Sequence, residues 1–249
     1  MELQLSTWPE IETYLKRSRL IVIPIGSMEQ HGPTGLIGTD FICPEVIARK
    51  ASKASDVMVG PTFNVGVAQH HMSFAGSICL RPSTMIAVMN DWTNALAHHG
   101  FNKLVWLNGH GGNIATINAA FAEYYHQRNY AADGIHKNVR CILRNWWDLR
   151  GIADLCARLY PEGHGQHATI SEVAVTYFCH PELSKTEELS PKIAPKHEPF
   201  TDADDYRRKY PDGRIGSDPS LARAKDGALI IETATLSLAE ELKTLNSES

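Results

Sequence analysis

The sequence lacks the features that mark several common classes of protein. Its 249 residues contain no apolar run of about 18 residues, so no segment is predicted to span a membrane. Lys and Arg, at 24, do not outnumber Asp and Glu, at 28, and the net charge of −4 gives no basic surface for nucleic acid. No charged segment followed by an apolar one marks a signal peptide at the N-terminus. We therefore expect a cytoplasmic globular protein that binds neither membranes nor nucleic acid.

Cysteine is also scarce, and several catalytic motifs are missing. The five cysteines are scattered and form no CxxC pair, which favours free thiols in a reducing compartment over disulfides or a zinc site. No GxSxG motif is present, so a serine hydrolase of the nucleophile-elbow type is not expected. Neither the P-loop pattern nor the dinucleotide fingerprint occurs. The chemistry must therefore come from other residues, and twelve histidines are available.

Apolar runs alternate along the chain with amphipathic segments of ten or more residues, an order typical of parallel strands joined by crossover helices. We predict a single α/β domain over residues 1–249, with three layers (α/β/α) and a mostly parallel sheet. Residues 184–220 are polar and are interpreted as an irregular surface excursion. The remaining segments are listed by type: strands at 19–26, 102–109 and 139–149, with a strand leading into a loop at 57–66; helices at 6–18, 43–55, 83–100 and 113–129, with a helix that begins at 170 and ends near Pro181; and a closing helix pair or one interrupted helix at 220–245.

Polar side chains follow all four predicted strands. In parallel sheets, ligands bind beyond the carboxyl ends of the strands, so these side chains are expected to lie at one edge. They are, in chain order, Glu29 and His31, His70 and His71, His110, and Trp147 with Asp148. His71 and Trp147 are candidates for contact with a substrate, although a loop histidine and a core tryptophan are equally ordinary roles for them.

The segment IPIGSMEQHGPTGLIGTD, residues 23–40, places Glu29, His31 and Asp40 in one glycine-rich stretch after an apolar strand. Carboxylate oxygen and neutral imidazole are suitable ligands for Zn, Mn or Fe. Taken alone, the stretch could equally be a surface loop with incidental charge. The segment NGHGGN adds His110, again directly after a strand and flanked by glycines that allow close approach to a ligand.

A third segment, EGHGQHATISE at residues 162–172, contributes His164, His167 and Glu172. Glu172 could simply be a carboxylate favoured by the N-terminus of a helix, and His167 a capping or solvent-exposed histidine. Taken together, however, the carboxylates and imidazoles of the three segments fit a site for two metal ions. A carboxylate can bridge two cations, and Asp40 is the candidate bridge. Such a pair can activate a water molecule and polarise a carbonyl.

These segments, in this order, resemble those of the creatininase (creatinine amidohydrolase) family, as do HMSFAGS, WWD and the late GSDPS. The resemblance implies a three-layer α/β/α fold and hydrolysis of a C–N bond in a small, often cyclic amide by a water that two divalent metals, Zn or Mn and possibly Fe, activate. It implies that Glu29 and His110 hold one metal and His31 and Glu172 the other, with Asp40 between them. His167 would be the proton shuttle and His164 a neighbour of the substrate. Homo-oligomers, often hexamers, are common in the family.

The chain also departs from the creatininase pattern. Gly111 and Gly112 stand where creatininases carry Tyr and Glu, and Gly163 where they carry Trp. The metal chemistry is therefore better supported than creatinine as the substrate. One alternative is deformylation of a formylamino-pyrimidine nucleotide in flavin-type biosynthesis, which would need a phosphate contact from Arg81, Lys103 or Arg144. Another is an inactive binding protein that retains its metals.

Overall fold

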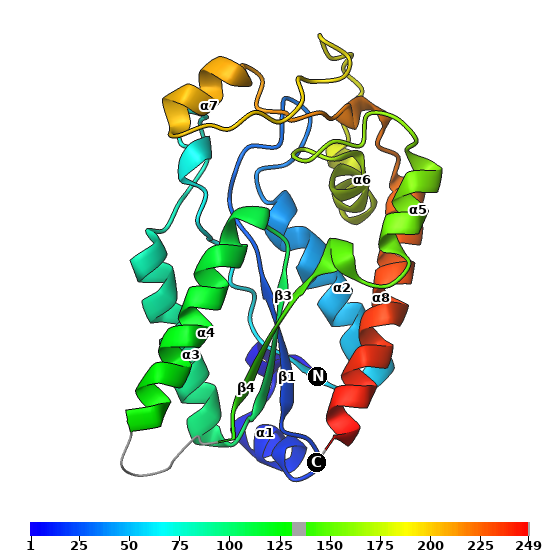
Figure 1. Cartoon of the computed structure of the whole chain (residues 1–249). Coiled ribbons are helices and arrows are strands. Elements are labelled where there is room, and N and C mark those ends of the chain that lie inside the picture. The colour runs from blue at the N-terminus through cyan, green and yellow to red at the C-terminus, as the bar shows by residue number, and fades with distance from the viewer. Residues whose placement is uncertain (131–137, 249) are drawn as a thin grey trace.

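A parallel sheet runs through the centre of the molecule, with helices on both faces (Figure 1). The structure is a computed structural model that describes residues 1–130 and 138–248. The strand order is β2-β1-β3-β4, and every neighbouring pair is parallel. The strands are β1 (Leu20–Ile25), β2 (Met58–Val59), β3 (Lys103–Asn108) and β4 (Arg140–Asn145).

The helices form the two outer layers of the predicted α/β/α arrangement. Helices α3 and α4 cover one face of the sheet, while α2, α6 and α8 cover the other, with α5 against α8 (Figure 1). Helix α1 lies near the beginnings of the strands, and α7 lies beyond their ends. Their bounds are α1 Trp8–Leu15, α2 Thr39–Ser55, α3 Pro82–His99, α4 Ile114–Tyr130, α5 Ile152–Leu159, α6 Ile170–Cys179, α7 Ala203–Lys209 and α8 Ala224–Ser247.

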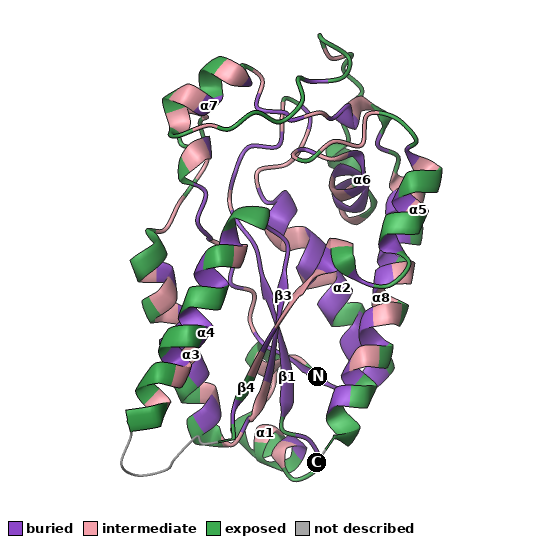
Figure 2. Ribbon diagram, in the orientation of Figure 1, coloured by how far each residue is buried: buried purple, intermediate pink, exposed green. Residues whose placement is uncertain are grey.

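Alternating side chains of the buried strands supply two separate cores. Leu20 and Val22 of β1 face the layer of α2, α6 and α8, whereas Ile21 and Ile23 face α3 and α4. Both β1 and β3 are buried along most of their length (Figure 2). This burial on two faces explains why the sequence shows continuous apolar runs here, because neither face can be polar.

The segment 57–66, predicted as a strand leading into a loop, contains only two residues of regular strand. Only β2 is regular, and after Gly60 the chain follows β1 through isolated hydrogen bonds, such as Phe63 N to Pro24 O at 2.9 Å. Pro61 has no N–H to donate to a ladder, so a regular strand cannot continue through it.

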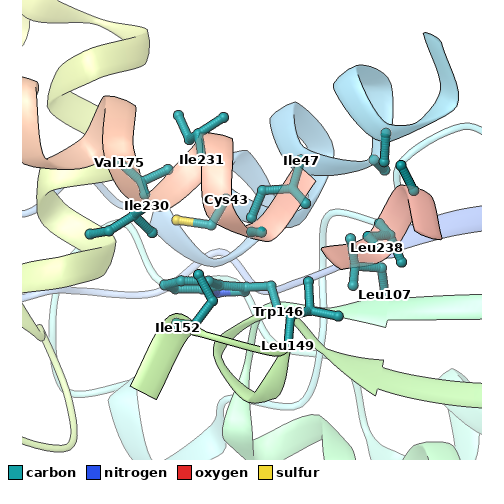
Figure 3. Packing of buried hydrophobic residues seen from close by; sticks show 14 of the residues in the cluster. Cys43, Ile47, Leu107, Trp146, Leu149, Ile152, Val175, Ile230, Ile231 and Leu238 are labelled. Carbon is teal, nitrogen blue, oxygen red and sulfur yellow. The ribbon is translucent and has the colours of Figure 1, made fainter. Parts of the chain in front are cut away.

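The fourth strand was predicted to extend to residue 149, but β4 ends at Asn145. Residues Trp146–Asp148 form a 3-10 turn after β4 rather than its last residues. Trp146 is nevertheless buried and Trp147 half-buried, as two neighbouring residues with different roles would be. Figure 3 shows the Trp146 ring within the core beside α2, with Cys43 on one side and Ile152 on the other.

Three further differences concern helices. The segment predicted as a helix pair or an interrupted helix is one helix, α8. The surface excursion at 184–220 contains the short helix α7, and α5 was not predicted at all. No helix among residues 1–130 and 138–248 is both long enough and apolar enough to cross a membrane.

Candidate metal centre

Six of the predicted site residues meet beyond the carboxyl ends of the strands. The loop after β1 carries Glu29 and His31, and the first turn of α2 carries Asp40. The remaining residues come from elsewhere in the chain: His110 after β3, His167 before α6, and Glu172 in the first turn of α6. All six are buried or nearly so, with side-chain exposures from 0% for Glu29 to 13% for Glu172.

Two glycines at the strand ends determine where Asp40 lies. A Cβ atom at Gly26, after β1, or at Gly109, after β3, would overlap the backbone carbonyl of Asp40. The N-terminus of α2 can therefore pack directly on both strand ends only because these two residues have no side chain. This contact brings a carboxylate from a helix into a site otherwise formed by loops.

We predict that Gly109→Ala weakens metal binding by about 10- to 100-fold, the usual effect of moving a residue that supports a ligand. The substitution removes no ligand but pushes the start of α2, and with it Asp40, away from the strand ends. Metal affinity by competition with a chelating dye would measure the effect. Gly111→Ala is the matched control in the same loop, because a Cβ there meets no atom within 4 Å. Equal affinity in the two variants would contradict this role.

Glu29, Asp40 and His110 form the first of two adjoining groups. His110 Nδ1 lies 3.2 Å from Glu29 Oε1 and 3.0 Å from Asp40 Oδ2. His110 Nε2 donates a hydrogen bond to the Val67 carbonyl at 3.0 Å. Because a carbonyl only accepts, Nε2 carries the hydrogen, and in the neutral ring the lone pair of Nδ1 points at two carboxylate oxygens. Three acceptors facing one point are suited to a cation.

His31, Asp40 and Glu172 form the second group in the same way. His31 Nδ1 donates to the Glu29 carbonyl at 3.1 Å, which leaves Nε2 facing Asp40 Oδ1 at 2.9 Å and Glu172 Oε1 at 3.9 Å. Within each group the candidate ligand atoms lie within 4.8 Å of one another. Asp40 therefore belongs to both groups, one oxygen toward each. This is the position predicted for a bridging carboxylate.

The charges of the site are unbalanced without a cation. Neither oxygen of Glu29, nor Asp40 Oδ2, has a hydrogen-bond partner among the described residues. Burial would lower the pKa of His31, but the Asp40 carboxylate against it raises that pKa to about 10. For His110, too, burial opposes the charged form, yet Glu29 and Asp40 together raise its pKa well above the ordinary value. A cluster that holds protons so strongly carries excess negative charge, so its residues fit divalent cations.

The position of Glu172 is compatible with both of the roles that the sequence left as alternatives. Its Oε1 accepts a hydrogen bond from Thr169 N at 2.5 Å, which closes a capping box at the start of α6. The same carboxylate also faces His31. Burial raises the pKa of Glu172 to about 7. The cap therefore fixes the carboxylate in an orientation that keeps it at the edge of the second group.

His167 lies beside both groups with one nitrogen free. Its Nε2 donates to the Gln30 carbonyl at 2.8 Å, and its Nδ1 is 3.7 Å from Glu29 Oε1. Burial, together with the neighbouring His71 and His31, lowers the pKa of His167 well below its ordinary value. The ring is therefore neutral at pH 7, and Nδ1 can accept a proton. His167 also forms a third possible ligand group with Glu29 and His31.

His71 lies behind Glu29 rather than in the larger cavity. Its Nε2 is 3.2 Å from Glu29 Oε1, and its Nδ1 accepts a hydrogen bond from Gln30 Nε2 at 2.9 Å. The Gln30 amide is held by Gly32 N and by the Gly213 carbonyl, at 2.8 and 2.9 Å. Gln30 thereby selects the tautomer in which the hydrogen of the neutral His71 ring is on Nε2, the nitrogen that faces Glu29. Sequence reasoning missed Gln30; its position between Glu29 and His31 was the available signal.

A cavity of 320 Å³ opens onto the two groups from one side. Trp147 and His164 line it, as predicted, together with Asp40, His110, His167 and Glu172. His164 Nε2 lies 2.9 Å from Ser171 Oγ, and burial lowers its pKa, so the ring is neutral. The cavity can thus hold a small uncharged molecule next to the carboxylates.

The cations proposed for a phosphate contact lie elsewhere. Among the described residues, no Lys or Arg lines this cavity, and Arg81 is at the N-terminus of α3. Lys103 donates to the Leu245 carbonyl at 2.7 Å, and Arg144 pairs with Glu241 at 2.6 Å. The structure therefore offers no support for the nucleotide deformylase alternative.

Comparisons with known proteins identify similar sequences and a similar fold. The model of the creatininase family, described as creatinine amidohydrolase, matches residues 4–242. The creatinine amidohydrolase of Pseudomonas putida is 25% identical over 95% of this chain and 94% of its own length. A mycofactocin precursor peptide peptidase of Mycobacterium ulcerans is 27% identical over 90% of this chain and 81% of its own. The solved structure of a mutant creatininase of Zn–Zn type has the same fold, with a TM-score of 0.86 at 21% identity over 99% of this chain and 98% of that one.

Proposed function

Because the chain belongs to the creatininase family, we propose that it is a metal-dependent amidohydrolase that hydrolyses a C–N bond of a small amide. The observation that carries the proposal is the pair of ligand groups that share Asp40. Two of its relatives are named a creatinine amidohydrolase and a mycofactocin precursor peptide peptidase, and both names describe hydrolysis of amide C–N bonds. Because the two names differ in substrate, they do not specify the amide that this chain would hydrolyse.

The residues present would hold two divalent cations side by side. Glu29, Asp40 and His110 would bind one, and His31, Asp40 and Glu172 the other, with Zn or Mn suited to mixed imidazole and carboxylate ligands. Two such cations lower the pKa of a water molecule and polarise an amide carbonyl. The hydrogen bonds of His110 to Val67 and of His31 to Glu29 fix both rings with the free nitrogen inward. This arrangement keeps the ligand set ready for metal.

His167 would move the proton that amide hydrolysis requires. Its neutral ring can take a proton at Nδ1 from the attacking water while Nε2 stays bound to the Gln30 carbonyl. The imidazolium formed there would then protonate the leaving nitrogen, because an amine anion is too basic to leave unprotonated. The half-buried Trp147 and the neutral His164 would form the wall against which the substrate rests.

We predict that removing metal abolishes hydrolysis and that restoring it recovers activity. Protein purified without chelators should contain close to two Zn or Mn ions per chain by elemental analysis. Treatment with dipicolinate should lower amide hydrolysis by at least about a hundredfold, since the carbonyl and water are then no longer activated. Substrates for the assay are creatinine, hydantoins, other lactams and formamides. Full turnover by metal-free protein would refute the proposal, and a fully loaded protein inactive on every amide would favour a binding protein.

A further inference from the structure

A second, smaller cavity of 150 Å³ opens onto the same centre. It shares four lining residues with the larger cavity: His110, Gly111, Gln166 and His167. Two of these, His110 and His167, carry the nitrogens that face the carboxylates. The shared residues therefore form a junction between the two cavities, and this junction is also where the reaction is proposed to occur.

Gly111 places no side chain at this junction. It is exposed, and a Cβ atom there would meet no other atom within 4 Å. A Cβ atom on the next residue, Gly112, would by contrast overlap His110 Nε2. A side chain can therefore be added at Gly111, which lines both cavities, without disturbing the fold.

The walls of the smaller cavity include the side-chain rings of His70, Phe200 and Tyr206. The His70 and Phe200 rings are 5.1 Å apart, and the Phe200 and Tyr206 rings 4.9 Å apart, measured between centroids. Tyr206 donates its hydroxyl to the Gly213 carbonyl at 2.7 Å, so its ring rather than its oxygen is available to a ligand. Among the described residues, no Lys, Arg, Asp or Glu lines this cavity. Such walls suit an aromatic group, which packs against ring faces and edges.

We propose that the substrate is an open-chain amide that occupies both cavities, with the scissile bond at the junction and an aromatic group in the smaller cavity. This inference rests on the proposed function and specifies its substrate class. The larger cavity, at 320 Å³, is within the range of about 300–1,000 Å³ typical of small-molecule sites, whereas 150 Å³ is below it. The smaller cavity therefore fits one substituent of a longer substrate better than a separate ligand.

Matched peptides that differ by one phenyl ring test the proposal. Acetyl-Gly-Gly-amide is compared with acetyl-Gly-Phe-amide and acetyl-Phe-Gly-amide, which place the ring on either side of the central bond. Cleavage by the metal-loaded protein is followed by chromatography and mass spectrometry. We expect one of the phenylalanine peptides to be preferred in kcat/KM by about 10- to 100-fold, the effect of burying a phenyl side chain.

Two variants test whether the smaller cavity causes the preference for an aromatic peptide. Gly111→Tyr should bring the ratio of kcat/KM for the aromatic and glycine peptides close to one, because its ring closes the junction. Phe200→Ala should lower the same ratio mainly through a higher KM, because it removes one wall of the smaller cavity. Phe178→Ala, an exposed aromatic residue of α6 outside both cavities, is the control and should keep the wild-type ratio.

Three results would overturn the proposed substrate class, and they differ in what they mean for the proposed amidohydrolase function. An aromatic preference that survives Gly111→Tyr would overturn the proposal. So would wild-type protein that hydrolyses cyclic amides or formamides but none of the peptides, and in that case the proposed amidohydrolase function would stand. Metal-loaded protein that hydrolyses neither kind of amide would overturn both.

Discussion

Asp40→Ala protein is expected to purify with less than about a tenth of the wild-type metal and to lose amide hydrolysis by at least about a thousandfold. The reason is that Asp40 contributes one oxygen to each ligand group, so a single substitution leaves two residues in each. Among the residues that the structure describes, no other candidate ligand belongs to both of these groups. Elemental analysis and turnover of the same preparation measure the two effects together.

The control for this prediction lies at the other end of the same helix. Asp56, the C-cap residue directly after α2, has an exposed carboxylate that pairs with Arg17. Asp56→Asn should retain both metal and activity, because asparagine tolerates the left-handed conformation found there. The fold of the Asp40 variant should survive, since Asp40 belongs to neither hydrophobic core, and circular dichroism would verify this. Retained turnover in Asp40→Ala protein without metal would refute the two-metal centre.

His167→Ala protein is expected to keep both metals and to lose about 10²- to 10⁴-fold in kcat, the usual contribution of a positioned proton carrier. His167 Nδ1 is farther from the carboxylates, at 3.7 Å from Glu29, than the inward nitrogens of His31 and His110 are from Asp40. Its hydrogen bond to Gln30 orients the ring without requiring metal. Steady-state kinetics with metal analysis on one preparation separates a proton carrier from a ligand.

His180 provides the matched control. It caps the C-terminus of α6, with its side chain 43% exposed, and lines neither of the two cavities. His180→Ala should behave as wild type in both assays. If His167→Ala lost one metal ion along with its activity, His167 would be a ligand in the third group, with Glu29 and His31, and its assignment as the proton carrier would be wrong.

The layers of the fold and the edge that carries the site were predictable from local sequence. Residues 20–25 and 103–108 are apolar almost without interruption, and only strands covered on both faces require that pattern. The long helices showed helical periodicity and clear end signals, such as Gly100 after α3. Since parallel strands end at one edge, Glu29 and His110 could be placed near each other without coordinates.

Sequence patterns did not predict the local structure or burial of residues that pack against distant parts of the chain. Trp146 was predicted in the fourth strand but lies in a 3-10 turn, and its ring packs in a core with residues of α2, α6 and α8. Helix α7 was hidden in a polar stretch, yet its Tyr206 forms a wall of the second cavity. A side chain that distant segments bury carries no local signal of that burial.

The sequence by itself determined which residues are able to bind metal and on which side of the sheet they lie. The sequence also offered Asp40 as the candidate bridge, but only the tertiary structure decided how Asp40 reaches both ligand groups, because the close packing of α2 on Gly26 and Gly109 sets its position. It likewise decided the tautomer of His71, through a Gln30 amide held by Gly213, a residue 183 positions away. Contacts of this kind depend on the relative placement of whole elements, which periodicity and motif spacing do not encode.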